Sequence, residues 1–369
     1  MTGLRSSLGK LFGGQSIEIP GAPQADLVVA PDTVEQVCRL LDFASEHGLV
    51  VLPWGSGGHQ GYGGRIEPDI VLSSAGFGDV TEWNPDDLTI VVGSGATVGE
   101  VATTIESRTQ SAVLPEWSPA ATVGGVIASG VSGWRRLRYG PTRDRVLQVE
   151  FVTGDGRFVT GGARLVKNVT GFDLPRLLTG SFGSLGFLTG VCLKLWPEPE
   201  TRATVVTDDP ERVLAVTYRP NAVLQVADRV SVYLAGSAAE VEAQASAVGG
   251  QVTDGFEWPR YPAGDCVINV RVPPAGVAPA LAELGDVEFV AAHGVGEVVA
   301  AVDVTAIPRL RAWAEERRGV VVVERAPDAV YSAHDPWGTP PGSSGLQRKI
   351  KAAFDPLDVM VPGRMPAGL

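Results

Sequence analysis

Hydrophobic residues in the first half of the chain form short continuous runs, separated by stretches with helical spacing. The runs 26–30, 49–52 and 88–92 have the length and composition of buried strands. Between the first two runs, apolar side chains recur at positions 34, 37, 40, 41 and 44, which is the spacing of a helix with one buried face. The pattern predicts a strand–helix–strand unit that ends at Pro53, directly before a glycine-rich loop.

Start and stop signals support these elements. Asp32, followed three residues later by Glu35, predicts a capping box at the start of the first helix, and Gly48 predicts its end. Thr97 with Glu100 predicts a second capping box and a helix that continues to about residue 108. Further strands are predicted at 146–152, 157–160 and 188–195, the first two joined by the turn sequence 153–156.

The second half of the chain has a different pattern, in which strand-like and helical segments alternate with little clustering of glycine. Strands are predicted at 229–234, 266–272, 287–292 and 319–324, and helices at 238–248, 277–284 and 308–317. This order is typical of an α+β domain with helices on one face of a sheet. We expect domains over 1–199 and 200–345, separated at the proline-rich stretch 196–199, and a C-terminal tail over 346–369 that opens with a short helix.

Composition and charge exclude several classes of protein. The 369 residues include 46 glycines without a collagen period, and a formal net charge of −12 makes nucleic acid an unsuitable partner. Cys38, Cys192 and Cys266 lie far apart without a CxxC motif, so we expect neither an iron–sulfur cluster nor disulfides in this chain. No apolar run reaches the length of a membrane span, and residues 1–10 lack a signal-peptide core, so we expect a cytoplasmic protein.

Glycine and other small residues gather in three clusters. In the first, six of the ten residues 55–64 are glycine, and the cluster follows a buried strand. Such a loop can turn successive N–H groups inward around a phosphate, although a flexible surface loop has the same composition. The second cluster, 118–130, favours either close approach of a ligand or tight helix–sheet packing, and the third, 180–188, leads into a strand. No P-loop is present, and the near-Rossmann spacing at 93–99 is interpreted as turn chemistry.

The three clusters, in this order and spacing, resemble the FAD-binding oxidases and dehydrogenases of the vanillyl-alcohol-oxidase (PCMH) type. The tail Phe354-Asp355-Pro356 with Pro362-Gly363-Arg364 resembles the end of that family, whereas Phe182 and Val361 depart from its usual residues. The resemblance implies a two-subdomain FAD-binding domain followed by a smaller ferredoxin-like α+β cap. It also implies that FAD is held by Trp54, Gly55, Ser56, Gly57, Gly58, His59, Gly61, Ser118, Thr122, Gly124, Gly125, Ala128, Ser129, Arg138 and Leu188.

Residues 135–144 and 166–174 more specifically resemble the small flavin subunits of bacterial glycolate oxidases. This resemblance implies oxidation of a 2-hydroxy acid, and partner subunits comprising a larger flavoprotein and an iron–sulfur protein, through which the chain would sit at the inner face of the membrane. Two hypotheses remain open. The chain is either a dehydrogenase in its own right or a flavin-binding subunit that relays electrons to a partner.

Several single residues are candidates for chemistry. His59 lies in Ser56-Gly57-Gly58-His59, which resembles loops that bond FAD covalently, and a non-covalent role is the alternative. The arginine run 135–145 can hold phosphates, a substrate carboxylate or a partner, or it is a solvated loop with internal ion pairs. His293, Arg325 and His334 are weak catalytic candidates, with Tyr331 and Glu324 as further residues that could line the flavin. Since His293 has no second histidine nearby in sequence, we expect no catalytic metal.

Overall fold

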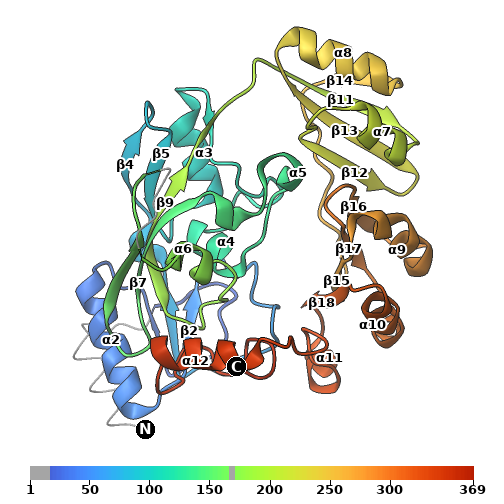
Figure 1. Cartoon of the computed structure of the whole chain (residues 1–369). Helices are drawn as coiled ribbons and strands as arrows, with labels where there is room; N and C mark the ends of the chain where they lie inside the picture. Colours follow the sequence, from blue (N-terminus) through green and yellow to red (C-terminus); the bar gives the residue numbers. More distant parts are fainter. Residues whose placement is uncertain (1–16, 166–170) are drawn as a thin grey trace.

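The computed structural model describes residues 17–165 and 171–369. Part of the glycolate-oxidase-like segment, residues 166–170, lies outside the described residues. Within the described residues the strands form sheets of three, five and eight strands and one two-stranded ribbon. Figure 1 shows the N-terminal sheets on one side of the molecule and the eight-stranded sheet on the other.

The three-stranded sheet is parallel and is built from the predicted strand–helix–strand unit. Its order is β1–β3–β2, and helix α2 joins β1 to β2. The bounds are β1 Leu27–Val29, α2 Val34–His47, β2 Val51–Trp54 and β3 Ile70–Ser73. Thr33, rather than Asp32, caps α2, because its hydroxyl accepts a hydrogen bond from the N–H of Gln36. Gly48 ends the helix in a left-handed conformation, as predicted.

The five-stranded sheet is antiparallel, in the order β4–β5–β9–β7–β8, and short helices pack on it. Its strands are β4 Val80–Asn84, β5 Thr89–Gly93, β7 Val146–Val152, β8 Phe158–Gly162 and β9 Phe187–Lys194. The helices of this region are α3 Val98–Glu106, α4 Val123–Ser129, α5 Arg136–Tyr139 and α6 Leu174–Leu178, with 3₁₀ turns at Ala75–Phe77 and Thr142–Asp144. The predicted capping box of Thr97 and Glu100 is present at the start of α3.

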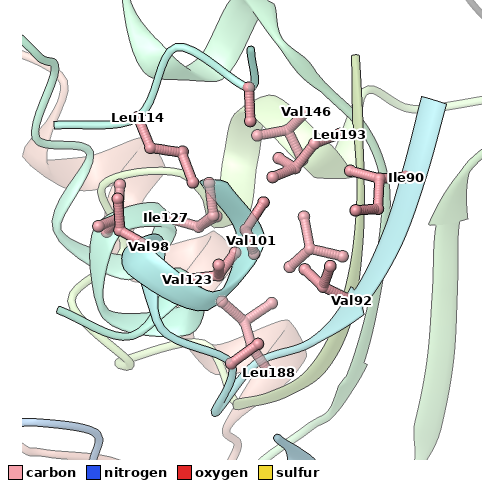
Figure 2. Packing of buried hydrophobic residues seen from close by; sticks show 14 of the residues in the cluster. Ile90, Val92, Val98, Val101, Leu114, Val123, Ile127, Val146, Leu188 and Leu193 are labelled. Atoms are coloured by element: carbon pink, nitrogen blue, oxygen red, sulfur yellow. The ribbon is translucent and has the colours of Figure 1, made fainter. Parts of the chain in front are cut away.

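Apolar side chains from α3, α4 and the strands fill the core of this region. Figure 2 shows Val98, Val101, Val123 and Ile127 from the helices packed against Ile90 and other strand residues. Because α4 packs against this sheet, its position next to β5 and β9 is fixed.

The proline-rich stretch at 196–199 leads from the N-terminal sheets to the eight-stranded sheet. β10 (Trp196–Pro197) pairs with β6 (Gln110–Ser111), and β11 then begins at Thr201. The sheet has the order β14–β11–β13–β12–β16–β17–β15–β18 and is antiparallel throughout. Its strands are β11 Thr201–Thr207, β12 Ala222–Val226, β13 Arg229–Gly236, β14 Gln251–Asp254, β15 Val267–Arg271, β16 Phe289–Ala292, β17 Glu297–Ala301 and β18 Val320–Arg325.

Four helices accompany this sheet, and they divide it into two halves with the same element order. The helices are α7 Pro210–Val216, α8 Ala238–Val248, α9 Val277–Leu284 and α10 Ile307–Glu316, with 3₁₀ turns at Pro274–Gly276 and Val304–Ala306. Each half runs strand–helix–strand–strand–helix–strand, and the halves join where β12 pairs with β16. The predicted bounds of α8 and α9 agree with the structure, whereas β11, β12 and β17 were not predicted.

The two faces of this sheet differ because side chains alternate along each strand. On β15, β17 and β18, one face is apolar and packs on helices α9 and α10, with the residues Ile268, Val270, Val298, Ala300, Val321 and Val323. The opposite face carries the polar residues Asn269, Glu297 and Glu324. Since Val267 pairs with Arg325 and Ile268 with Val323, Glu324 is the extra residue of a β-bulge.

The end of the chain returns to the N-terminal sheets. After α11 (Asp328–Ala333), helix α12 (Ser344–Phe354) lies beneath them in Figure 1. Met360 is buried and forms a parallel bridge with Val51 of β2. The tail therefore contributes to the same core as the first strand–helix–strand unit.

Candidate functional site

The three glycine clusters meet at one cleft, which we call the cofactor cleft. It encloses about 620 Å³ including its open side. Nine of the predicted cofactor-binding residues line it: Trp54, Gly55, His59, Thr122, Gly124, Gly125, Ala128, Ser129 and Leu188. The lining also includes residues that were not among the predicted cofactor-binding residues, such as Gln60, Ser74, Ser94, Ser181, Phe182 and Arg364.

The glycine loop (residues 55–64) offers backbone donors to this cleft. Within the described chain, no hydrogen-bond acceptor is found for the N–H groups of residues 55–59. A Cβ atom on Gly55 would lie 2.1 Å from Oγ1 of Thr122, and one on Gly124 would lie 2.8 Å from Cβ of Ser94. The glycines thus keep the two walls close together and leave backbone N–H groups free for an anion.

The other predicted cofactor residues lie near the cleft without lining it, with one exception. Ser56 and Gly58 are exposed in the loop, and the Trp54 ring packs beneath Gly57. Gly61 lies against the backbone of Glu324. The carbonyl of Ser118 accepts a hydrogen bond from the N–H of Ala121, ahead of α4. The exception is Arg138, which lies in a different groove.

Arg364 brings a buried positive charge into the cofactor cleft. Its side chain donates to Gln60, with 2.8 Å from Nη1 to Oε1, while Nε is buried and has no acceptor in residues 17–165 and 171–369. No carboxylate of the described chain pairs with it. Burial lowers the pKa of Arg364 to about 10, so the guanidinium remains charged at neutral pH. A buried cation with an unused N–H fits a phosphate in the cleft.

Other features of the cleft also fit a polar ligand. The hydroxyl of Ser94 is buried and has no hydrogen-bond partner in the part of the chain that the structure describes. Ser94 lines the cleft, so the segment 93–99 does more than form a turn. His59 lies at the edge of the cleft, and burial lowers the pKa of its imidazole to about 4. The ring is therefore neutral at neutral pH. Free backbone donors, a buried guanidinium and a buried hydroxyl together match the phosphates and polar atoms of FAD.

A second, smaller pocket adjoins the cofactor cleft, and we call it the polar pocket. It encloses about 480 Å³ including its open side. Tyr62, three residues after His59, lines it, and the Tyr62 ring lies 5.2 Å from that of Phe182, which lines the cofactor cleft. On another side, Trp117, Trp134 and Tyr261 form an aromatic wall with ring centroids 4.3 to 5.8 Å apart. The pocket therefore suits a small molecule next to the cofactor.

Glu324 is the most deeply buried acid of the polar pocket. Oη of Tyr261 donates to Oε2 of Glu324 at 2.5 Å, and Nδ2 of Asn269 donates to Oε1 at 2.7 Å. Burial raises the pKa of Glu324, although these hydrogen bonds oppose the shift. Burial also raises the pKa of Tyr62, and the Glu324 charge adds to that effect. A carboxylate with a raised pKa beside a small pocket is suited to take up a proton.

Asn269 joins Glu324 to a second carboxylate. Its Nδ2 also donates to Oε1 of Glu297 at 2.7 Å, so the amide orientation is fixed, because Oδ1 in that place would face two carboxylates. Oδ1 of Asn269 is buried and has no donor among the described residues. Two arginines border the same pocket: Arg136 lies 3.4 Å and Arg271 4.0 Å from the Glu297 carboxylate.

The three weak catalytic candidates, His293, Arg325 and His334, line neither the cofactor cleft nor the polar pocket, whereas Glu324, considered only as a residue that could line the flavin, lines the polar pocket. His293 is buried, and its Nε2 lies 2.8 Å from Oε1 of Gln225. Arg325 is exposed and donates to the carbonyl of Gly264, because it follows Glu324 on the strand and points the other way. His334 is half-buried after α11, and Oη of Tyr331 donates to the carbonyl of Gly61 at 2.7 Å. The Tyr331 hydrogen bond thus connects the glycine loop to the second half of the chain.

Residues 17–165 and 171–369 contain no group of three His, Cys, Asp or Glu side chains placed to hold a metal ion. None of the helices in these ranges is both long enough and apolar enough to cross a membrane.

Comparison with known proteins identifies similar chains. Residues 25–162 match the model of the FAD binding domain. The chain is 35% identical over 184 residues to the glycolate oxidase subunit GlcD of Bacillus subtilis, covering 49% of this chain and 39% of the relative. It is 38% identical over 126 residues to the glycolate oxidase subunit GlcE of Escherichia coli, covering 32% of this chain and 35% of the relative. The matches thus span well under half the length of these relatives.

A solved structure extends the likeness to most of the chain. Alkyldihydroxyacetonephosphate synthase superimposes with a TM-score of 0.68 over 92% of this chain and 76% of the other, at 14% sequence identity. At that identity the match concerns the fold alone. At 92% coverage the similarity includes most of the eight-stranded sheet, which lies outside the residues 25–162 that match the family model.

Proposed function

We propose that this chain is an FAD-dependent oxidoreductase of the vanillyl-alcohol-oxidase (PCMH) type that acts on a 2-hydroxy acid. Support comes from residues 25–162, which match the model of the FAD binding domain. The substrate class is supported by the glycolate oxidase subunits among its relatives. The observation that carries the proposal is the buried Glu324 network in a small polar pocket beside the cofactor cleft.

We further propose domain limits that follow from the sequence. The FAD-binding domain covers 1–199, the cap covers 200–345, and the tail 346–369 returns to the first domain. In support, β11 begins at Thr201, and Met360 packs beside β2. The cap is proposed to be a duplicated ferredoxin-like unit, since each half has the order strand–helix–strand–strand–helix–strand with the first strand of the unit next to the third and fourth.

The chain's own residues suggest how FAD is held. The free N–H groups of residues 55–59 and the Arg364 guanidinium would bind the pyrophosphate, and Ser94 would donate or accept a hydrogen bond deeper in the cleft. When bound, FAD would supply the two-electron acceptor for a hydride equivalent, one proton with two electrons, from the hydroxyl-bearing carbon of the substrate.

The polar pocket supplies the remaining functions. The Glu324 carboxylate takes the hydroxyl proton of the substrate, and burial favours this transfer because it raises the pKa of the carboxyl group. Arg136 and Arg271 bind the substrate carboxylate as paired charges. Oδ1 of Asn269 accepts a hydrogen bond from the substrate, which satisfies an otherwise unpartnered buried oxygen.

We propose that the chain works as a flavin-binding subunit that passes electrons to a larger flavoprotein and an iron–sulfur protein. Those subunits would place it at the inner face of the membrane. The alternative is a stand-alone oxidase or dehydrogenase with flavin bonded to His59, which is favoured by the neutral imidazole at the edge of the cleft. Acid precipitation of the FAD-loaded protein separates the two forms of binding: flavin that stays in the pellet is covalently bound.

The test of the proposed activity is anaerobic mixing of the FAD-loaded chain with glycolate or D-lactate. Loss of flavin absorbance near 450 nm would show that this chain oxidises the substrate itself, before any partner is added. If the absorbance is unchanged with every 2-hydroxy acid tried, and also after partner subunits are added, the proposed activity is wrong.

The role of Glu324 is tested by Glu324→Gln, which keeps the size of the side chain and removes the carboxylate. We expect flavin reduction to slow by about a hundredfold or more, since a general base contributes on the order of 10²–10⁴ in rate. FAD affinity should stay unchanged. Glu316→Gln, on the exposed end of α10, is the matched control and should reduce flavin at the wild-type rate. Equal rates for Glu324→Gln and wild type would exclude this residue as the base.

A further inference from the structure

Most of the arginine run is used in internal contacts. Arg135 pairs with Glu116 at 2.5 Å, and Arg136 contacts Glu297. Arg145 is fully buried and donates to the carbonyls of Val113 and Gly140. Arg138 differs from these residues, because its side chain makes no ion pair or hydrogen bond with any residue of the described ranges.

Arg138 lies in a groove between the N-terminal sheets and the eight-stranded sheet, which we call the arginine groove. It encloses about 850 Å³ including its open side. One wall is formed by Arg138 and Tyr139 of α5 with Trp196 of β10, and the other by Arg219 and Asn221 ahead of β12 and by the end of β13. None of these residues lines the cofactor cleft or the polar pocket.

The second wall contributes another unused cation. Arg219 is exposed and, like Arg138, has no ion pair or side-chain hydrogen bond with the part of the chain that the structure describes. Its backbone is held at a φ of 50°, a conformation that is unusual for a residue with a side chain. Two guanidinium groups without carboxylate partners therefore face one groove, in a chain whose net charge is −12.

Asn221 gives the groove a buried polar group. The residue is 2% exposed, and its N–H donates to the carbonyl of Tyr233. Its side-chain amide has no hydrogen-bond partner in the described chain, and the residue borders both this groove and the neighbouring one around Phe256. Because the amide borders the groove and makes no internal hydrogen bond among the described residues, its N–H groups are available to a ligand that accepts a hydrogen bond.

The acidic residues nearby do not neutralise the groove. Glu198 pairs with Arg202 at the neighbouring groove. The Glu240 carboxylate is fully exposed, and the charge of Arg138 contributes to lowering its pKa. The carboxylate accepts hydrogen bonds from the N–H and the hydroxyl of Ser237 at the start of α8. The groove therefore has two cations and one polar amide, and the acidic group that interacts with Arg138 is the exposed Glu240 carboxylate, which is hydrogen-bonded to Ser237.

We propose that the arginine groove is a binding site for a small organic anion with carboxylate or phosphate groups. Arg138 and Arg219 would bind the anionic oxygens from opposite walls, and the Asn221 amide would donate a further hydrogen bond. This site shares no lining residue with the polar pocket, so anion binding here can be tested independently of the proposed oxidation.

The experiment is calorimetric titration of the FAD-loaded protein at low ionic strength, with inorganic phosphate in one arm and succinate in the other. FAD loading occupies the phosphate-binding loop, so that binding there does not interfere. We expect saturable one-site binding of at least one anion, and the arm that binds tells whether the site prefers phosphate or carboxylate. Arg138→Gln and Arg219→Gln should each weaken it by about tenfold, the loss of a charge-assisted hydrogen bond.

The matched control is Arg143→Gln, which removes an exposed arginine from the same run outside the groove and should bind like wild type. Asn221→Ser keeps a polar side chain and should weaken binding less than either arginine variant. Melting temperatures of all variants confirm that they are folded. The proposal is overturned if neither anion binds saturably, or if Arg138→Gln and Arg143→Gln bind equally well.

Discussion

At the scale of single residues, Arg364 is the clearest link between the sequence and the cofactor. It is buried in the cleft, where its side chain donates to Gln60 and its Nε has no acceptor among the described residues. We expect Arg364→Gln to weaken FAD binding by about tenfold or more, because a buried charge-assisted hydrogen bond to a phosphate contributes roughly 1.5–3 kcal/mol. Titration of the apoprotein with FAD, followed by flavin fluorescence, measures the effect.

Arg348→Gln is the control for Arg364→Gln. Arg348 is an exposed residue of α12, so this substitution removes the same charge from the same part of the chain without changing the cleft. The two variants should differ clearly in FAD affinity. If they bind FAD equally well, Arg364 does not contact the pyrophosphate.

His59 makes the stability of the apoprotein depend on pH. Burial lowers the pKa of its imidazole to about 4, below the ordinary 6.5, so the unfolded chain takes up this proton at a higher pH than the folded chain. The stabilisation that the neutral ring contributes is therefore complete above about pH 6.5 and is lost as the pH falls toward 4.

We expect the melting temperature of wild-type apoprotein to fall more steeply between pH 7 and 5 than that of His59→Gln, which has no imidazole to protonate. Thermal unfolding at several pH values tests this difference. Parallel curves would show that His59 is already open to solvent.

At the scale of secondary-structure elements, α12 is fixed by one buried lysine. Nζ of Lys351 donates to the carbonyls of Ser184 at 3.0 Å and Met360 at 2.7 Å, and it pairs with Asp355 at 2.5 Å. Asp355 in turn accepts the N–H groups of Val359 and Met360. This network connects the tail to the segment 181–188, which lines the cofactor cleft.

Lys351→Met should lower the free energy of unfolding by about 3–5 kcal/mol, because it leaves the Asp355 carboxylate buried without its cation. Lys349→Met, on the exposed face of the same helix, is the control and should cost little. Urea unfolding of both variants measures the difference. Comparable stabilities would show that the tail is held by its apolar contacts instead.

Local patterns in the sequence predicted elements better than they predicted side-chain partners. The capping box at Thr97 and the bounds of α8 are set by neighbouring residues, so both were predicted correctly. Asp32 and Thr33 are both good capping residues, and only the fold selects Thr33. Short strands such as β12 and β17 are stabilised by their neighbours in the sheet, which the sequence does not show.

In the candidate site, too, local features were predicted from the sequence and long-range side-chain contacts were not. The glycine loop was visible because it requires residues without side chains, and it does line the cleft. The contributions of Arg364 and Asn269 depend on burial by segments far away in the chain, so their immediate sequence neighbours do not predict them. Arg364 was noted only because the tail resembles the end of a known family. Among Glu324, Arg325 and His334, the sequence could not tell which faces inward, because that depends on the bulge in β18.

At the scale of the whole molecule, the proposed FAD site joins segments from most of the chain. The cofactor cleft takes residues from the glycine loop, α4, the segment 181–188 and the tail. A ligand that binds only the folded arrangement stabilises it by mass action, by about 2.7 kcal/mol at a concentration one hundred times its Kd. We therefore expect FAD to raise the melting temperature of the entire chain in one transition.

Differential scanning calorimetry of the apoprotein with increasing FAD tests this expectation. Arg364→Gln should need a higher FAD concentration for the same rise in melting temperature. Two separate transitions, of which only one moves with FAD, would show instead that the eight-stranded sheet unfolds independently of the cofactor cleft.

The alternating faces of the eight-stranded sheet have a consequence for how substrate preference can change. On β15, β17 and β18, the residues that pack on helices and those that border the polar pocket occupy every other position. Substitutions at Asn269 or Val299 can therefore alter the pocket while the apolar packing on the other face stays as it is. The polar face of this sheet therefore offers positions where directed evolution can search for new substrates at low risk to folding. The glycine loop offers fewer, because Gly55, Gly57, Gly61 and Gly63 leave no room for a Cβ atom.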